Sequence, residues 1–547
     1  MGGLGTKNSI LEKGMGVALL GYVFFVSLAA FFPDSKDQVL AHFDKPYYTA
    51  GETINFKLYL PQKYLEKELM IKIEIYNPEG EAVHSSYLKS YHDHVAGYYD
   101  IPYQIEPGMY LFRATASTGY KSEVLTLLQA HIPVYSERLL DAPNSFTDST
   151  RTLSTEVIGE LLVDIEIPRR DFQPRDSISL NVLVRDPSGK PLKAFASISI
   201  TDVQLIGENR QTPAIYTASP QYNSQQLSDF IQLQGHLMGS GPREMVAFKF
   251  AENNQMLYSV TDENGDFFLA LPEFYGNQVL QYIPKYSQNR ELRWAMTGPS
   301  STSFEKLPLS PSVQHYLQES RNRKLIYQLF KRVEPAAVKA PSPHLVTPTP
   351  DFRYDADNYP FTDLQTFSRE VVSPLKFIRE KHSTGHFQMF DPDSRSMAYG
   401  TPLFIIDGQL TKHQETLTSL DFQKLREIKL YSRTTTISEY FGFAGFSGVV
   451  EILSKEGLMK IDSSYLLKSY QIEGLQPSSE YSSPNLPMDQ PYLVPLIYWN
   501  PKISTTLEPG QTLGFRHSDD QGEFKIEVVA QSEDGRRGYG IILYQVR

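Results

Sequence analysis

The chain of 547 residues contains no cysteine. This absence excludes disulfides, cysteine nucleophiles, thiolate metal sites and the lipid-bearing cysteine of a bacterial lipoprotein. Basic residues are also in the minority, because 52 Lys and Arg stand against 63 Asp and Glu, a formal net charge of -11 at pH 7. Lys and Arg are scattered, and they form no basic stripe that could neutralise a phosphate backbone. The sequence therefore predicts no nucleic-acid partner.

The motifs of the common enzyme classes are absent as well. The sequence has no G-x-S-x-G elbow, no H-E-x-x-H, no phosphate loop and no dinucleotide fingerprint. Asp519 and Asp520 form a carboxylate pair, but they lie in a turn-like stretch without an apolar pocket of the kind that general acids occupy. We therefore predict no catalytic residue, no cofactor and no enzymatic activity.

His92 and His94 are the best metal candidates of the sequence. In an H-x-H pair on a strand, both imidazoles point to one face and can bind zinc together with a distant carboxylate. The tripeptide lies in a polar, turn-like stretch before Ala96, however, and this setting favours a solvated loop. We adopt the loop interpretation and predict no metal site.

The residues that are abundant favour sheets. Aromatic residues make up 12% of the chain, with 34 Tyr and 31 Phe against 2 Trp, and 36 Pro and 34 Gly are spread between short β-branched runs. This composition is typical of strands joined by turns. At this length the chain is expected to form several domains. The sequence thus predicts a mainly β, multidomain protein.

The N-terminus predicts export. Met15 to Phe32 is an uncharged apolar run preceded by Lys7 and Lys13, the pattern of a Sec-type signal. Cleavage near Ala29 or Ala30 is one expectation. Because 18 residues lie at the lower limit for a bilayer-spanning helix, retention as an anchor, with membrane contact through residues 15–32, is the other. Either way we expect the periplasm, the outer membrane or the cell surface.

Changes of pattern along the chain predict seven regions. Strand-like runs dominate four of them, and a helical, Pro-rich stretch connects the small β module to the α/β domain. The regions are a signal peptide or anchor at 1–35, β-sandwiches at 38–137 and 158–232, a small β module at 233–295, a helical and Pro-rich connection at 300–395, an α/β domain at 396–458 and a C-terminal β-sandwich at 459–547.

The segment from His42 to Leu60, HFDKPYYTAGETINFKLYL, resembles the signature of alpha-2-macroglobulin-type modules. In that signature a strand ends in Asp-Lys-Pro and leads through a Tyr and a Gly-Glu turn into the next strand. The matching residues are Asp44, Lys45, Pro46, Tyr47, Gly51 and Glu52. The resemblance implies a macroglobulin-like, Ig-like sandwich, in which these residues mark the fold and not a reactive site.

A second stretch is similar to the plug domain of TonB-dependent outer-membrane transporters. It comprises TPLFIIDGQL at 401–410 and EYFGFAGFSGVVEILSKEG at 439–457. The matching residues are Asp407, Gly408, Gly442, Gly448 and Val449. The stretch departs from the pattern at Phe441, where Tyr is usual, and at Ser447, where Asn is frequent. A transporter barrel needs well over 250 residues by a rough count, and only 90 follow Gly457, so this unit cannot plug a barrel of its own.

A third stretch, LIYWNPKISTT around Trp499, resembles the closing module of a group of Bacteroidota envelope proteins. That group combines macroglobulin-type modules, a carboxypeptidase-regulatory-like sandwich and a plug-like insert, and the resemblance extends over nearly all of the chain after the export signal. The resemblance implies this architecture. From the modular order and the missing barrel we expect a non-catalytic binding or scaffold protein, with an envelope or outer-membrane protein as partner, a TonB-dependent transporter among the candidates.

Protease inhibition is the alternative function that the macroglobulin resemblance implies. Covalent trapping of proteases requires a Cys-Gly-Glu-Gln thioester, which a chain without cysteine cannot form. Reversible inhibition of endopeptidases stays open as the second hypothesis.

Overall fold

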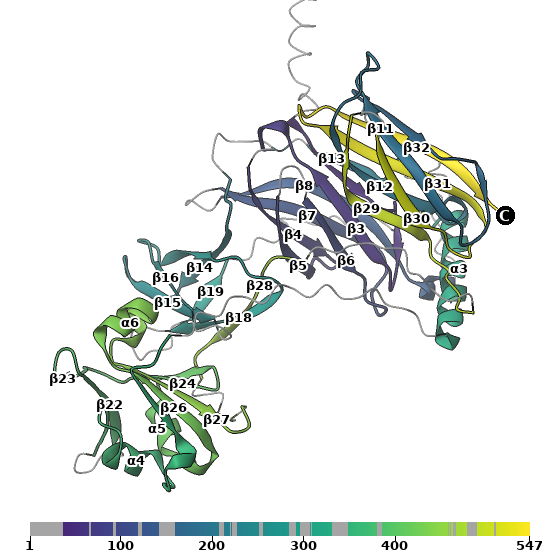
Figure 1. Ribbon diagram of the computed structural model, residues 1–547. Helices are drawn as coiled ribbons and strands as arrows, with labels where there is room; N and C mark the ends of the chain where they lie inside the picture. The colour runs from purple at the N-terminus through teal and green to yellow at the C-terminus, as the bar shows by residue number, and fades with distance from the viewer. Residues whose placement is uncertain are drawn as a thin grey trace, which may run out of the picture.

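The computed structural model describes residues 37–64, 67–90, 95–118, 123–141, 159–206, 213–218, 220, 227–250, 255–283, 291–295, 307, 309–330, 348–379, 385–457, 459, 461–462, 466–477, 489–507 and 510–547. The expected export signal and the pair His92 and His94 lie outside these ranges. Within them the chain is mainly β and multidomain, which confirms the predicted fold class (Figure 1). No helix in this described part is long and apolar enough to cross a membrane.

The first sandwich occupies the start of the described chain. Its elements are β1 (Val39–Phe43), β2 (Tyr48–Thr49), β3 (Thr53–Tyr59), η2 (Gln62–Tyr64), β4 (Met70–Tyr76), β5 (Ala82–Lys89), β6 (Val95–Asp100), β7 (Gly108–Thr118), β8 (Glu123–Tyr135), η4 (Glu137–Asp141) and β13 (Ile215–Ala218). The two sheets have the orders β13-β1-β3-β6 and β2-β8-β7-β4-β5. Ile54, Phe56 and Leu58 of β3 enter the core between the sheets, as their period of two predicts.

The second sandwich combines two stretches that are far apart in sequence. The first stretch supplies β9 (Leu162–Glu166), β10 (Asp171–Phe172), β11 (Ser177–Arg185) and β12 (Ala194–Asp202), which is followed by α2 (Val203–Ile206), and the second supplies β29 (Leu496–Thr505), β30 (Gln511–Arg516), β31 (Gly522–Ser532) and β32 (Arg537–Val546). The sheet orders, β10-β32-β31-β12-β29 and β30-β11-β9, interleave strands of the two stretches. This corrects the prediction of separate sandwiches at 158–232 and 459–547, because β12 is paired on both edges with strands of the second stretch.

The third module lies between the two stretches of the second sandwich. It contains β14 (Ile231–Leu237), β15 (Met245–Phe250), β16 (Met256–Val260), β17 (Asp266–Leu271), β18 (Asn277–Ile283), β19 (Leu292–Trp294) and β28 (Ser469–Glu473). Its sheets have the orders β17-β14-β19 and β16-β15-β18-β28. The chain thus leaves this module after β19 and returns to it through β28, so the α/β domain is an insertion within it.

The α/β domain is larger than its sequence pattern indicates. It contains β20 (Phe352–Asp355), η5 (Ala356–Asn358), α4 (Leu364–Glu370), β21 (Leu375–Ile378), β22 (His386–Asp391), β23 (Ser396–Met397), β24 (Leu403–Ile406), β25 (Gln409–Thr411), α5 (Gln414–Thr418), η6 (Phe422–Lys424), β26 (Leu425–Tyr431), α6 (Thr434–Tyr440), η7 (Gly442–Gly445) and β27 (Val449–Ser454). Its main sheet has the order β20-β26-β27-β24-β25. Because β20 pairs with β26, the domain includes Phe352, which corrects the predicted start at 396 and the assignment of 300–395 to a connection alone.

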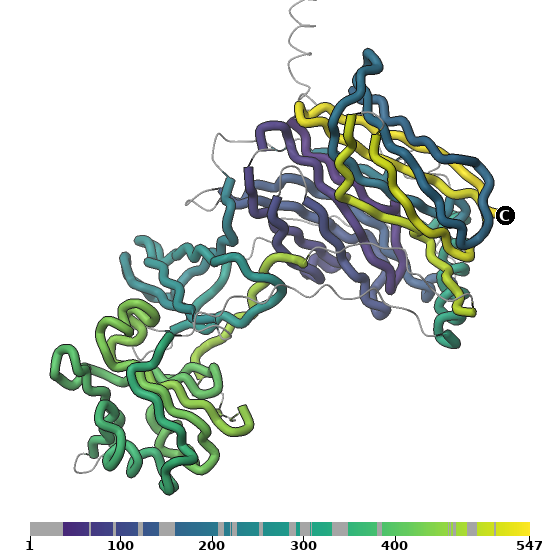
Figure 2. The backbone as a smooth tube through the Cα atoms, viewed as in Figure 1, coloured from purple at the N-terminus to yellow at the C-terminus, as the bar shows by residue number. Residues whose placement is uncertain are grey.

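One long helix, α3 (Pro311–Leu329), lies in the chain between β19 and the α/β domain. The Ser310 side chain caps its first turn by accepting a hydrogen bond from the Val313 N–H, and Pro311 occupies a first-turn position where its missing N–H costs nothing. In space α3 packs against the two sandwiches, far from the α/β domain (Figure 1). Figure 2 shows the sandwiches side by side at one end, the third module in the middle and the α/β domain at the other end.

Candidate functional site

The signature segment of the first sandwich forms a tight turn around Asp44, directly after β1. The Asp44 carboxylate accepts hydrogen bonds from the Tyr48 hydroxyl (2.5 Å), the Asn55 backbone N–H (3.0 Å) and the Asn55 side-chain amide (3.0 Å). Burial raises the pKa of Asp44, and the neighbouring Lys45 charge opposes that effect. Since these partners belong to the turn and to the strand β3 that follows it, Asp44 shapes the local backbone and does not present its carboxylate to a ligand.

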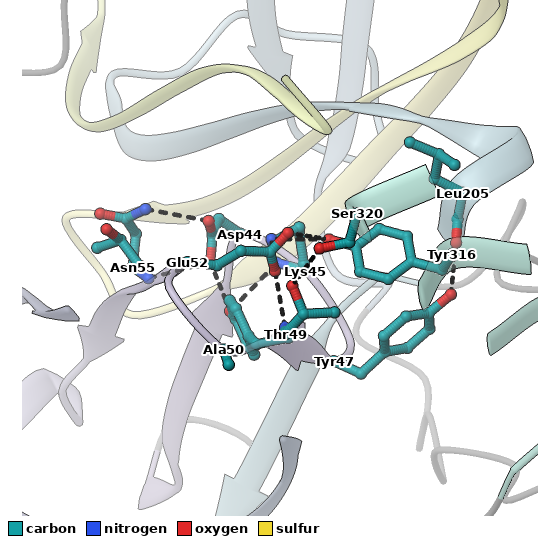
Figure 3. Close-up of polar contacts among 12 residues, drawn as sticks. Asp44, Lys45, Tyr47, Thr49, Ala50, Glu52, Asn55, Leu205, Tyr316 and Ser320 are labelled. Carbon is teal, nitrogen blue, oxygen red and sulfur yellow. Dashed lines mark hydrogen bonds and ion pairs between the residues drawn. The ribbon is translucent and has the colours of Figure 1, made fainter. Parts of the chain in front are cut away.

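Pro46, Tyr47 and Gly51 complete this turn. Pro46 lies three residues after the end of β1, outside any strand, where its missing N–H breaks no strand pairing. Gly51 has φ +83°, a backbone conformation that strains residues with a side chain, and an added Cβ would also lie 2.3 Å from the Tyr103 ring. The Tyr47 hydroxyl donates a hydrogen bond of 2.5 Å to the Leu205 carbonyl in α2 (Figure 3). The turn is thereby tied to the second sandwich, from which α2 extends.

Lys45 and Glu52 of the same turn bind α3. The Lys45 ammonium lies 2.6 Å from a Glu52 carboxylate oxygen and donates a hydrogen bond of 3.2 Å to the Tyr316 hydroxyl, which itself donates to Glu52 at 2.5 Å (Figure 3). Burial acts to raise the pKa of Glu52, but the Lys45 charge and the hydrogen bonds that Glu52 accepts outweigh it and lower that pKa. Lys45, Glu52 and Tyr316 thus form a buried triad in which each side chain contacts the other two.

Further along α3, polar side chains reach both sandwiches. Ser320 contacts Thr49 of the first sandwich, with 3.1 Å between the hydroxyl oxygens. Arg323 donates a hydrogen bond of 2.7 Å to Asp520 of the second sandwich. Burial and the neighbouring Asp520 raise the pKa of Asp202, which lies 4.0 Å from Arg323, to about 6. The helix therefore holds the two sandwiches together, although neither of them directly precedes it in the chain.

Buried polar residues also fill the contact between the sandwiches, which we call the sandwich seam and which is formed by β1 and β3 against β12 and β31. His42 of β1 lies 2.6 Å from the Ser197 hydroxyl and 3.0 Å from a Glu527 carboxylate oxygen. Glu527 also lies 2.7 Å from the Lys525 ammonium and accepts a hydrogen bond of 2.8 Å from the Ala214 N–H. Glu527 thus has Lys525 as a partner on its own strand and His42 as a partner across the seam, and all three side chains are almost completely buried.

The charge of Glu527 is well stabilised in this setting. Burial opposes ionisation, but the Lys525 charge and the hydrogen bond from His42 outweigh burial and lower the pKa of Glu527 to about 2. Trp499, one of the predicted fold markers, is buried beside the seam with its ring centre 5.1 Å from that of His42. The closing module is thus part of the seam.

In the α/β domain the fold markers shape backbone turns. Asp407 has φ 45° between β24 and β25 and accepts hydrogen bonds from the Ser454 N–H (2.8 Å) and hydroxyl (2.6 Å), and from the Met459 N–H (2.9 Å). The glycines Gly408, Gly442 and Gly448 all have positive φ. A Cβ at Gly448 would lie 2.5 Å from Met389, and one at Gly442 would lie 2.4 Å from the Tyr258 hydroxyl of the third module.

The most exposed aromatic side chains of the described chain lie in this same domain. Tyr399 is 97% exposed and Phe446 is 67% exposed. Their loops are joined by a hydrogen bond of 2.7 Å from the Ser447 hydroxyl to the Tyr399 carbonyl. We call these two side chains the aromatic pair. An exposed pair of large aromatic rings is a feature of protein-binding surfaces.

These sites can hold domains together and can offer a contact surface. Among the described residues no group of three or more His, Asp or Glu side chains is placed to hold a metal ion, and His92 and His94 lie outside them. The sequence pattern indicated the turn residues but gave no role to His42, Glu527 and Tyr316. The available signal was the polar residues that alternate with apolar ones in strands, a pattern that normally indicates a solvated face.

No family model matches the chain, and no curated protein matches it in sequence. Among solved structures, Salmonella alpha-2-macroglobulin reacted with methylamine is 8% identical with a TM-score of 0.23, and the match covers 93% of this chain and 39% of that protein. Escherichia coli alpha-2-macroglobulin activated by porcine elastase is 8% identical with a TM-score of 0.23, covering 93% of this chain and 44% of that protein.

This chain therefore spans less than half the length of those two proteins. TM-scores as low as 0.23 carry no argument about topology or activity. What is established is the mainly β, multidomain architecture, with structural neighbours among the macroglobulins at low similarity.

Proposed function

We propose that the protein is a non-catalytic scaffold of a bacterial envelope, which binds an envelope or outer-membrane protein through its α/β domain. The proposal is supported above all by the aromatic pair, Tyr399 and Phe446. The α/β domain that carries the pair lies at the end of the molecule away from the sandwiches (Figure 1). Aromatic side chains on a rigid support are suitable anchors for a protein partner because they bury a large area at a low entropic cost.

The remainder of the chain suits the role of a rigid support. The sandwich seam and the contacts of α3 join the two sandwiches through buried ion pairs and hydrogen bonds. The third module in turn shares apolar core with the first sandwich, because Met70 and Tyr87 belong to its cluster. The two sandwiches and the third module thereby form one support, which carries the α/β domain at its end.

The location rests on the sequence. The apolar run 15–32 after two lysines favours export, and the resemblance of 401–457 to transporter plugs favours an outer-membrane partner. A plug-like domain without a barrel of its own is suited to bind the apolar surface of another membrane-associated protein, a TonB-dependent transporter among the candidates. We propose the periplasm or the outer membrane as its location.

The test is affinity purification of the tagged full-length protein from native cells after mild crosslinking, with mass spectrometry of the recovered proteins. We expect an outer-membrane protein, and we expect Tyr399→Ser with Phe446→Ser to remove it. The matched control is Leu507→Ser in the second sandwich, since Leu507 is 59% exposed and lies outside the α/β domain. Recovery of the same partner with the double variant, or recovery of a secreted protease in place of an envelope protein, would refute the proposal.

A further inference from the structure

The third module and the α/β domain meet through the faces of two sheets, a contact that we call the α/β seam. On one side, β15 and β18 contribute Ala247 and Ile283. On the other side, β24 and β27 contribute Leu403, Ile405 and Val449, and all five side chains belong to one buried apolar cluster. The seam is therefore closed in part by ordinary apolar packing.

Polar residues lie next to the apolar ones on the same two sheet faces. Because side chains two residues apart on a strand point the same way, Lys249 follows Ala247 and Glu451 follows Val449 on the seam side. Gln281, the register partner of Lys249 on β18, shares that face. The exposed fractions are 0% for Lys249, 6% for Gln281 and 8% for Glu451. One end of the α/β seam thus holds polar groups away from water.

The Lys249 ammonium has few hydrogen-bond partners there. Its ammonium donates one hydrogen bond, of 3.1 Å, to the neighbouring Phe250 carbonyl. The Gln281 side-chain oxygen is buried without a hydrogen-bond partner. Burial lowers the pKa of Lys249 to about 8, although the Glu451 charge acts to raise it. A buried ammonium with so few partners opposes the closed state, since water would satisfy all three of its N–H groups.

The charged groups on the facing strands have partners within their own sheet. The Glu451 carboxylate accepts a hydrogen bond of 2.8 Å from the Tyr431 hydroxyl and lies 3.6 Å from the Lys429 ammonium, both on β26 of its own sheet. Lys429 also lies 3.8 Å from Glu427 on the same strand. On the Lys249 side, the register partner on the edge strand β16 is the uncharged Met256. No acidic group from the third module compensates Lys249 among these strand neighbours.

We propose that the α/β seam is a releasable joint, in which buried Lys249 opposes closure and allows the α/β domain to separate from the third module as an intact unit. Separation places Lys249 in water and leaves the internal cores of both domains closed. The rest of the contact includes the hydrogen bond from the Tyr258 hydroxyl to the Phe441 carbonyl, which opening would exchange for water. This inference concerns motion between domains and does not depend on the identity of the partner.

Two neighbouring valines allow a direct test, because the chain has no cysteine of its own. Val449 faces the α/β seam, whereas Val450 faces the interior of the α/β domain, and both are fully buried. In Val449→Cys the thiol becomes accessible when the seam opens. In Val450→Cys, the matched control, it becomes accessible only when the domain itself unfolds. We expect a thiol reagent to label the first full-length variant at least about tenfold faster than the second.

Lys249→Met then tests the part played by the ammonium. Methionine has a similar length and no charge, so we expect this change to slow the labelling of Val449→Cys about tenfold and to leave the labelling of Val450→Cys unchanged. Equal labelling rates for the two cysteines would overturn the releasable joint. Faster labelling of Val449→Cys in the Lys249→Met background would show that the ammonium holds the seam closed, and would overturn the role proposed for it.

The pH dependence adds a third readout. A lysine whose pKa falls from 10.5 in the open state to about 8 in the closed state releases its proton on closure between these values. The closed state is therefore strengthened as pH rises through this window, by up to roughly tenfold per pH unit. Labelling of Val449→Cys, normalised to a free thiol, is expected to fall from pH 8 to 9.5 and to stay flat in Lys249→Met. The same fall in Lys249→Met would contradict the assignment to Lys249.

Discussion

The sandwich seam and the α/β seam both bury charged side chains between two sheets, but the buried charges differ in the partners that they have. In the sandwich seam, Glu527 lies within 3.0 Å of both His42 and Lys525. In the α/β seam, Lys249 donates a single hydrogen bond to the carbonyl of the next residue. A buried charge specifies a joint when its partners lie across the contact, and it weakens the joint when they do not. We infer that one seam is permanent and the other reversible.

The largest expected effect is the loss of Glu527 from the sandwich seam. Glu527→Ala removes the charge next to Lys525 and leaves that buried ammonium without its ion-pair partner. We expect a loss of about 3–5 kcal/mol in the free energy of unfolding. Urea unfolding followed by the fluorescence of Trp499, in a Trp294→Phe background, measures it.

The control for that experiment is Glu533→Gln, because Glu533 is exposed and pairs with the equally exposed Lys193. We expect it to change stability by less than about 0.5 kcal/mol. An effect of Glu527→Ala no larger than this control would contradict the permanent character of the sandwich seam.

Acid should weaken the sandwich seam through the same residue. The pKa of Glu527 falls from 4.5 to about 2 in the folded protein. Its contribution to stability is therefore complete above about pH 4.5 and is lost as pH falls towards 2. We expect the urea midpoint, reported by Trp499, to fall steeply between pH 4.5 and 3. The difference between wild type and Glu527→Ala should shrink over the same interval, and a constant difference would contradict this assignment.

A smaller loss is expected from Tyr316→Phe in α3. The substitution removes the hydroxyl that joins Glu52 and Lys45 but keeps the aromatic ring. Hydrogen bonds to charged groups contribute more than neutral ones, so we expect a loss of about 2 kcal/mol. Faster amide exchange along 311–329 than in wild type is the readout. Gln318→Ala, on the outer part of the helix, should leave that exchange unchanged.

The smallest effect on stability is expected for the aromatic pair. Tyr399 and Phe446 are exposed and contribute little to any core. Replacing both by serine should change the free energy of unfolding by less than about 0.5 kcal/mol while removing the envelope partner. Thermal unfolding of the double variant checks the first expectation. A large loss of stability would mean that the pair is structural and not a contact surface.

Some of this architecture could be predicted from local pattern. The spacing of two between Ile54, Phe56 and Leu58 is enough to put them on one face of a strand, and the structure places these side chains in the first core. Gly51 predicted a turn, and it has the positive φ that a turn permits to glycine. Both inferences work because they depend on neighbours within a few residues.

The burial of polar residues could not be predicted in this way. Lys57 and Ser197 alternate with apolar neighbours, which by itself indicates a solvated face, yet both are fully buried in the sandwich seam. The pattern shows that a strand has two different faces. It does not show that a second sheet covers the polar one.

The sequence by itself determined the mainly β character, the turns of the signature segment and the absence of cysteine chemistry, because each depends on composition or on short-range geometry. Only the tertiary structure decided which strands share a sheet. It joins Ile200 to Ile526 in register and places Tyr316 beside Glu52. Pairings over hundreds of residues depend on which faces bury best against each other, and no local pattern carries that information.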